Sequence, residues 1–183
     1  NVNTNQQIQF WYNNFGSFTL NGNGNNKPWL YFHGNSILGD MAVSNVKGIY
    51  FGGTNTINSF APLSGTCDNL LQIWGGSSIT MATDTMKLDW VYMYEMKANG
   101  GATFIADNVY GTSYNNTGWS TTLIPQTNFY WVGGTGNWTD PNHWSYTSGG
   151  TAGVCPLPNR FDNVFFDVNS FTAPNQYVNA NTT

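Results

Sequence analysis

Residues 29–58 read WLYFHGNSILGDMAVSNVKGIYFGGTNTIN, and this stretch decides the fold. Two segments in it, 29–33 and 48–52, are rich in aromatic residues, which favour strands. Each is followed by a corner that contains Gly and Asn, and then by a short segment centred on isoleucine, at 36–38 and 56–58. Glycine and asparagine are typical of tight turns. The stretch therefore predicts a repeating unit in which a sharp corner joins two strands.

The same unit recurs between residues 29 and 105. Its longer strands start roughly 20 residues apart, a spacing that is typical of solenoid repeats. The expected longer strands are 29–33, 48–52, 70–74 and 88–92, and the shorter ones are 36–38, 56–58, 78–81 and 103–105. We predict an all-β fold, a parallel β-solenoid with Gly- and Asn-rich turns. An antiparallel β-sandwich is the alternative, because it would use the same strands with the turns as hairpins.

The solenoid prediction also says which side chains point inward, because like residues of successive coils stack in columns. One expected column is Ile37, Ile57, Ile79 and Phe104, and another holds Tyr31, Tyr50, Ile73 and Val91 or Tyr92. The segment 85–97 (TMKLDWVYMYEMK) has a period of two and many aromatic residues, so we predict a strand there in place of a helix.

Composition argues against several classes of protein. Only 8% of the 183 residues are charged, whereas 16% are aromatic and 21 residues are glycine. With a net charge of −4 and five Lys and Arg residues, the chain lacks the cationic surface that binds nucleic acid or an anionic membrane. Its apolar runs are shorter than the roughly 20 residues of a membrane helix. We therefore expect neither a nucleic-acid partner nor membrane insertion.

A polar segment at 120–128 (STTLIPQTN) marks the expected boundary between two modules. Residues 1–122 are predicted to be the C-terminal part of one solenoid module, and residues 123–183 the start of the next. The second part opens with FYWVGGTGNWTDPNHW at 129–144. Segments 163–167 and 176–178 are expected to form its first rungs.

These motifs, in this order, resemble repeat modules of the giant cell-surface adhesins of gliding Bacteroidota, the SprB-like mobile adhesins. The likeness rests on the WxGGxGxWxDPxxW opening from residue 131, the DNVFFD segment at 162–167, and the GGATFIADN and NNTGW segments between 100 and 119. The resemblance implies a secreted, non-enzymatic segment of a long repetitive adhesin on the cell surface, used in attachment and gliding motility.

The resemblance also implies export by the type IX secretion route. The implied partners are neighbouring modules of the same chain, the gliding and secretion machinery, and surface polysaccharide. Under the same resemblance, Thr85 in Asp84-Thr85-Met86 matches the short acceptor pattern of Bacteroidota O-glycosylation. The chain starts without Met or a signal peptide, so we expect it to be an ordered fragment of a longer protein.

Two other functions would use the same fold. One is a polysaccharide-active β-helix enzyme or a carbohydrate-binding module, which would need a groove lined by neighbouring carboxylate and basic side chains. The other is a filament subunit that self-associates end to end. The two histidines, His33 and His143, lie in no nucleophile motif, and the Lys and Arg residues do not cluster in the sequence. We therefore assign no catalytic residues.

Cysteines and tryptophans supply two further candidate sites. Cys67 and Cys155 form a disulfide if they pair, and otherwise they are unpaired buried residues. Trp131, Trp138 and Trp144 offer rings that can stack on sugars, or they pack together as a small core. Trp11 and Tyr12 are further candidates for sugar stacking.

Calcium is the metal that the acidic and amide residues of the sequence suggest. Asp140, Asp162, Asn163 and Asp167 supply the oxygen ligands that calcium prefers. No calcium-loop motif accompanies them, so their expected role is to cap turns, and we predict no cofactor.

Overall fold

The computed structural model describes residues 6–22, 27–110 and 114–180. The chain divides into two compact units, Asn1–Ile124 (unit 1) and Pro125–Thr183 (unit 2). Apart from one short 3-10 helix, every regular element in the described part of the chain is a β-strand. The last strand of unit 1, β13 (Ser120–Leu123), ends just before the division between the units.

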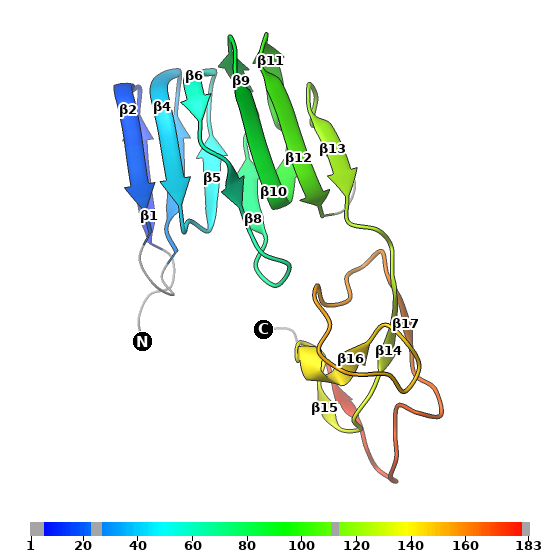
Figure 1. Cartoon of the computed structure of the whole chain (residues 1–183). Helices are drawn as coiled ribbons and strands as arrows, with labels where there is room; N and C mark the ends of the chain where they lie inside the picture. Colours follow the sequence, from blue (N-terminus) through cyan, green and yellow to red (C-terminus); the bar gives the residue numbers. More distant parts are fainter. Residues whose placement is uncertain (1–5, 23–26, 111–113, 181–183) are drawn as a thin grey trace. The chain divides into compact units, whose positions relative to one another are not determined.

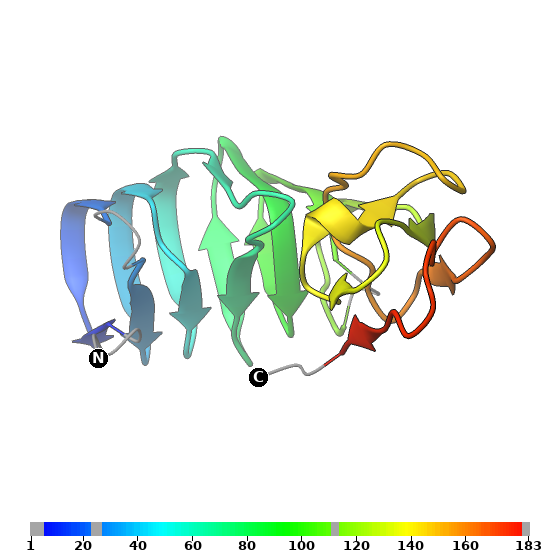
Figure 2. The same cartoon turned by 90° about the horizontal axis from the view of Figure 1, so that it is seen from below.

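Unit 1 is built of two sheets between which the chain passes repeatedly (Figure 1). Sheet A contains β1 (Gln7–Trp11), β3 (Trp29–His33), β5 (Gly48–Phe51), β7 (Leu63–Ser64), β8 (Leu71–Trp74), β10 (Thr85–Tyr94), β12 (Thr103–Val109) and β13. Sheet B contains β2 (Asn14–Asn21), β4 (Ser36–Ser44), β6 (Asn55–Phe60), β9 (Ser78–Met81) and β11 (Lys97–Gly100). A view from a second direction shows the coils of unit 1 following one another in sequence order, from blue to green (Figure 2).

Every ladder between these strands is parallel. The result is a β-solenoid of about five turns, which confirms the predicted fold class. The antiparallel sandwich is not formed, because hairpins would have paired consecutive strands in opposite directions. The strand expected within 85–97 is also confirmed, as β10.

Equivalent residues of successive coils lie about 20 residues apart, as the sequence predicts. Tyr31 pairs with Tyr50, and Tyr50 with Trp74, at spacings of 19 and 24 residues. Trp74 pairs with Tyr94, and Tyr94 with Tyr114, each 20 residues further on. One coil is therefore longer than the others.

The extra length lies in a loop, residues 65–70, that leaves sheet A between β7 and β8. Leu63 and Ser64 of β7 pair with Leu88 and Asp89 of β10, whereas β8 starts opposite Val91. The loop thus occupies a single position of the ladder, opposite Trp90. Its insertion lengthens the coil without breaking the stack.

Stacked apolar columns fill the interior of unit 1. Leu30, Ile49, Ile73 and Met93 follow one another in register on sheet A, and all four are buried. Beside them, the ring of Phe32 stacks on those of Phe10 and Phe51, with centroids 5.0 and 5.7 Å away. Such columns remove apolar surface from water in every coil, which is the main source of stability in a repeat protein.

The predicted columns were correct in part. Ile57, Ile79, Phe104 and Val91 are buried, as expected. The expected column of Ile57, Ile79 and Phe104 is wrong, however, because Ile79 pairs with Asn55 in sheet B, and Phe104 lies in β12 of sheet A, opposite Met86. The prediction was wrong for Ile37, which is 54% exposed, while its neighbour Leu38 is buried and pairs with Ile57. It was also wrong for Tyr31 and Tyr50, which are only partly buried while Ile73 is fully buried. Successive side chains of a strand point to opposite faces, so an error of one residue exchanges core and solvent.

A bend in sheet B explains why simple alternation fails there. In β4 the buried residues Leu38 and Met41 are separated by two residues, Gly39 and Asp40, that are not buried. The neighbouring strands β2 and β6 show the same spacing at equivalent positions. The bend therefore recurs at the same place in successive coils. Beyond it, the inward-pointing residues of each strand are displaced by one position from simple alternation.

Asparagine and serine side chains tie the corners of one coil to the next. The side-chain oxygen of Asn35 accepts a hydrogen bond from the backbone N–H of Thr54 at 2.9 Å. In the next coil, the hydroxyl of Ser77 donates to the carbonyl oxygen of Phe51. Gly34, with φ +74°, gives the first corner a backbone conformation that other residues rarely adopt. The Gly- and Asn-rich corners thus have a direct physical role.

Unit 2 is a small fold of short, mixed strands. Its elements are β14 (Asn128–Trp131), β15 (Gly136–Asn137), the 3-10 helix η1 (Pro141–His143), β16 (Trp144–Ser145), β17 (Asn163–Phe165) and β18 (Val178–Asn179). β14 pairs antiparallel with β16 and parallel with β17, and β15 pairs with β18. The segments expected to be first rungs contain β17 and β18, but these two strands do not pair with each other. In this structure they are not adjacent rungs of a coil.

Candidate functional site

A strip of aromatic side chains lies on the outer face of sheet A. Because the strands are in register, outward residues of successive coils form columns along the solenoid axis. One column is Gln9, Tyr31, Tyr50, Trp74, Tyr94 and Tyr114, and the column beside it is Gln7, Trp29, Gly48, Gln72 and Tyr92. We define the aromatic strip as Trp29, Tyr31, Tyr50, Trp74, Tyr92, Tyr94 and Tyr114 of these columns, together with Tyr110, whose ring centroid lies 6.2 Å from that of Tyr92.

Neighbouring rings of the aromatic strip are in contact. The ring centroids of Trp74 lie 5.4 Å from those of Trp29 and 6.4 Å from those of Tyr92, in edge-to-face arrangements. Tyr94 and Tyr114 stack at 5.5 Å. These distances are typical of favourable aromatic pairs. Ring contacts thus connect Trp29, Trp74 and Tyr92 across successive coils, and Tyr94 and Tyr114 form a second stacked pair. Trp74, Tyr94 and Tyr114 keep 42%, 36% and 54% of their surface exposed.

Because Gly48 has no side chain, the indole of Trp29 has room to lie over this position. A Cβ atom at position 48 would lie 2.6 Å from Cζ3 of Trp29. Trp29 and Trp74 belong to strands separated by β5, which corresponds to about 9.5 Å between their backbones. Their ring centroids are only 5.4 Å apart, so the two indoles lean toward each other over Gly48. Tyr50 leans in a similar way over Gly52, where a Cβ would be 2.9 Å from its Cε1.

The two columns carry no formal charge. Besides aromatic residues and Gly48, they hold the amides of Gln7, Gln9 and Gln72. Nε1 of Trp74 donates a hydrogen bond to the side-chain oxygen of Gln72 at 3.2 Å. The nearby carboxylate of Glu95 raises the pKa of the Tyr94 phenol, so this ring also stays neutral. The two columns therefore combine aromatic rings with neutral amide and hydroxyl groups.

The strip continues toward the first described coil through His33 and Trp11. The ring of His33 stacks on that of Tyr31 at 5.9 Å and on that of Trp11 at 4.0 Å. Trp11 and Tyr12 are strongly exposed, so both remain available for sugar stacking, as the sequence suggested.

A groove of about 570 Å³ lies on the flank of the solenoid, where β6 ends and β10 begins. Asp40, Asp84 and Lys87 contribute to its lining. Asn58 and Ser59 donate hydrogen bonds to the Asp40 carboxylate, and these bonds lower the pKa of Asp40. Lys87 forms an ion pair with Asp107 at 3.4 Å. A general acid for glycoside hydrolysis needs a raised pKa, so Asp40 is suited to remain ionised instead.

Thr85, the candidate O-glycosylation site, is exposed at the first position of β10 and lines the same groove. Its hydroxyl is therefore open to a modifying enzyme. The preceding residue, Asp84, has φ +80°, which turns the chain sharply into the strand.

Trp131 and Trp144 are fully buried, at 0% exposure, and Trp138 packs against them. Their rings meet edge to face, with centroids about 5 Å apart. The indole N–H groups of Trp131 and Trp144 donate to the carbonyl oxygens of Gly134 and Trp138. Neither Trp131 nor Trp144 presents a ring face to a ligand, so the sugar-stacking prediction fails for these two residues. They form the core of unit 2 instead.

The carboxylates suggested for calcium serve local turns. Asp140 accepts a hydrogen bond from the backbone N–H of Asn142 at 2.9 Å. Asp162 accepts from the backbone N–H of Asn159, and Asp167 from that of Asn169. Within the described ranges, these three carboxylates do not gather into a cluster that could share a cation.

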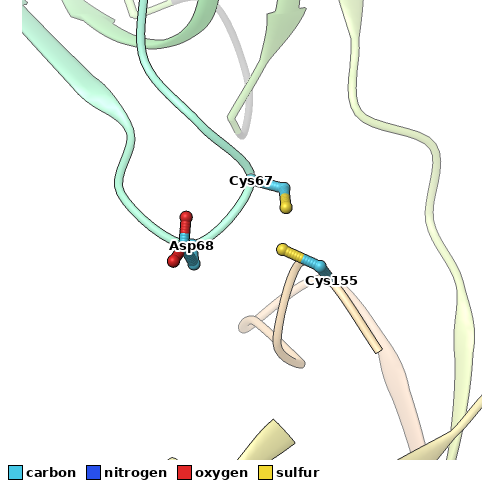
Figure 3. A group of neighbouring side chains, drawn as sticks. All are labelled: Cys67, Asp68 and Cys155. Carbon is cyan, nitrogen blue, oxygen red and sulfur yellow. The ribbon is translucent and has the colours of Figure 1, made fainter. Parts of the chain in front are cut away.

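Cys67 and Asp68 lie in the loop of residues 65–70 (Figure 3). The hydroxyl of Thr66 donates to the Asp68 carboxylate at 2.6 Å, and this bond lowers the pKa of Asp68. Cys155, labelled in the same figure, belongs to a loop of unit 2, where the hydroxyl of Tyr146 donates to its carbonyl oxygen. Neither cysteine is a free thiol.

We predict that Cys67 and Cys155 are joined to each other in the oxidised protein. Peptide mapping without reductant is expected to yield one linked peptide holding both residues, which separates on reduction. Protease cleavage between Leu123 and Asn128 should leave the two pieces joined until reductant is added. The variant C67S serves as control, because its cleaved pieces should separate at once. Disulfide-linked dimers of the wild type would contradict the pairing.

The sequence-based reasoning missed the aromatic strip, although a signal was present. Tyr31, Tyr50, Trp74, Tyr94 and Tyr114 recur at the period of the coil. Tyr31 and Tyr50 are missed because the prediction from sequence assigns them to the interior, and Trp74, Tyr94 and Tyr114 because no motif marks them as a surface. In a strand with one buried face, every second side chain points to solvent, and the register of the strand decides which side chains these are.

Among the described residues, no helix has the length and apolar character needed to cross a bilayer. Comparison with known protein families, with curated proteins and with solved structures yields no match, so fold and site geometry are the basis for any functional assignment.

Proposed function

We propose that this chain is a structural and adhesive segment of a long, repetitive, secreted cell-surface adhesin that serves surface attachment and gliding motility. The observation that carries the proposal is the aromatic strip, whose rings recur on successive coils on the outside of a stacked solenoid, in two columns that hold no charged residue. Exposed aromatic residues in contiguous patches are typical of interaction surfaces.

The solenoid supports a mechanical role. Successive coils are joined by parallel ladders on both sheets, and a continuous apolar core runs through them. A force along such a stack is shared among many hydrogen bonds and packed side chains, so the unit resists bending. With a net charge of −4, the chain has little electrostatic repulsion from other surfaces.

The motif order that resembles the SprB-like mobile adhesins supports the cellular setting. Under this proposal the segment lies outside the cell, is exported by the type IX route, and contacts neighbouring modules and the gliding machinery. Its source would be a member of the Bacteroidota. Under the same proposal the segment acts by contact and not by catalysis.

The test is immunogold electron microscopy of intact cells that express the full chain, with an antibody against this segment. We expect label along thin surface filaments, and loss of label after mild surface proteolysis. Beads coated with the chain should also adhere to a solid surface more strongly than beads coated with albumin. Label confined to the periplasm or the medium, or beads that do not adhere, would contradict the proposal.

A polysaccharide-active enzyme is the second candidate function, and the groove beside Asp40, Asp84 and Lys87 is the observation that favours it. The groove brings carboxylate and basic side chains together on the flank of the solenoid. The lowered pKa of Asp40 and the ion pair of Lys87 with Asp107 make it better suited to binding than to proton transfer. We therefore place the adhesive function first.

A further inference from the structure

We propose that the aromatic strip binds a neutral polysaccharide, a linear chain of pyranose units that lies along the solenoid axis. The inference rests on the proposed adhesive function and adds to it the class of ligand and the residues that bind it.

The periodicity of the strip is the first argument. Parallel strands repeat every 4.8 Å or so, and the column from Tyr31 to Tyr114 places one aromatic ring on each successive coil. Such a surface offers an equivalent aromatic contact on each coil along the solenoid axis. A polymer of identical rings can use every such contact, whereas a globular partner concentrates its binding on a few central residues.

The orientation of the rings is the second argument. The glycines at positions 48 and 52 leave space that the rings of Trp29 and Tyr50 occupy, since a Cβ there would lie 2.6 and 2.9 Å from ring atoms. The rings of Trp29 and Tyr50 therefore cover backbone that would otherwise be open to solvent at these two glycines. Trp74, at 42% exposure, meets Trp29 edge to face with 64° between the ring planes, so the two rings present their faces in different directions. Flat aromatic surfaces suit the C–H faces of pyranose rings, which are apolar.

The third argument concerns charge and hydrogen bonding. The two columns contain no Asp, Glu, Lys or Arg, so nothing in them would hold the carboxylate or sulfate of an anionic polysaccharide. They do contain amides, at Gln7, Gln9 and Gln72, and the phenol groups of the tyrosines. Amide and hydroxyl groups donate and accept hydrogen bonds, as sugar hydroxyls do. A binding site with apolar walls and a few polar groups is typical of neutral small ligands.

The strip also differs from the other face of the same solenoid. Residues that are not buried on sheet B include Ser17, Thr19, Thr56 and Asn58, together with the carboxylate of Asp40. If aromatic stacking served only to stabilise the contact between coils, aromatic rings would be expected on the outer faces of both sheet A and sheet B. The restriction of the rings to sheet A therefore points to a ligand.

The experiment measures binding of the whole 183-residue chain to microcrystalline cellulose by depletion from solution, and to cellohexaose by calorimetry. We expect binding that changes little with salt. The substitution W74A is expected to weaken it about tenfold, the loss of one good aromatic contact, and Y94A should also weaken it. W74Y keeps a ring at the position and should retain most of the binding.

Tyr177→Ala is the matched control, because Tyr177 is an aromatic residue of unit 2 that is 63% exposed. It should leave binding unchanged. Circular dichroism and thermal unfolding of each variant are compared with those of the wild type, so that a loss of fold is not mistaken for a loss of contact. Polygalacturonate serves as the anionic probe.

Three results would overturn the inference. The first is a wild-type chain that binds neither cellulose nor cellohexaose although beads coated with it adhere, which would leave the adhesive function standing with another ligand. The second is binding to polygalacturonate alone that salt abolishes and W74A leaves intact. The third is concentration-dependent self-association that W74A removes, which would make the strip an interface between copies. Beads that fail to adhere would instead count against the adhesive function itself.

Discussion

Leu38→Ala is expected to destabilise unit 1 by about 2 to 5 kcal/mol, whereas Ile37→Ala is expected to have little effect. Leu38 is fully buried and stacks on Ile57 in the next coil, so its truncation leaves a cavity inside a continuous apolar column. Ile37 is 54% exposed on the outer face. The measurement is urea unfolding of the whole chain, followed by far-UV circular dichroism.

The two substitutions are matched in position and nearly in size, so they compare the two faces of one strand. A loss of stability from Ile37→Ala as large as that from Leu38→Ala would contradict the register of β4. A large loss from Ile37→Ala with little loss from Leu38→Ala would instead make the inward position of Ile37, as inferred from the sequence, correct after all. Equal tolerance of both changes would mean that the column carries little of the stability.

Gly39→Ala is the second change with a large expected effect, a loss of about 3 kcal/mol. Gly39 lies in the stacked bend of sheet B, where it contacts the coil below. A Cβ atom at this position would lie 1.8 Å from the carbonyl oxygen of Gly16 and 2.4 Å from its carbonyl carbon. The obstacle is backbone and not a flexible side chain, so relief requires two coils to move apart. Thermal unfolding should show a clearly lower midpoint.

Gly16→Ala provides the control from the adjoining strand. A Cβ atom there would meet nothing within 4 Å, and the backbone is outside the left-handed region. The substitution is expected to be neutral, or to stabilise by about 0.5 kcal/mol because it restricts the unfolded chain. If Gly39→Ala were tolerated as well as Gly16→Ala, the close approach of the two coils in the bend would be wrong.

Much of the fold was predictable because it depends on local signals. Gly34 and Asn35 mark a corner in the sequence, and in the structure they form one, with Asn35 bonded to the next coil. The period of about 20 residues follows from strand length and corner length, both of which are local properties. The choice of parallel coils over a sandwich followed from the same period.

The candidate site was less predictable. Trp131 and Trp144 drew attention because tryptophans among glycines are conspicuous, yet they are buried in unit 2. Trp74 and Tyr94 lie in predicted strands, but no motif in the sequence marks the outward residues of those strands as a site. Aromatic side chains are stable both in a core and in an exposed stack, so composition alone does not separate the two.

The sequence by itself determined that the chain is all-β, that it coils with a period near 20, and that its surface is nearly free of charge. These properties depend on residue type and on spacing along the chain. Only the tertiary structure decided which alternate residues face outward, because the stacking of the strands fixes the buried face of each sheet and the bend at Gly39 interrupts the alternation within sheet B. A shift of one residue moves a side chain across the sheet, and this is why Tyr31, Trp74 and Tyr94 became a surface and Leu38 became core.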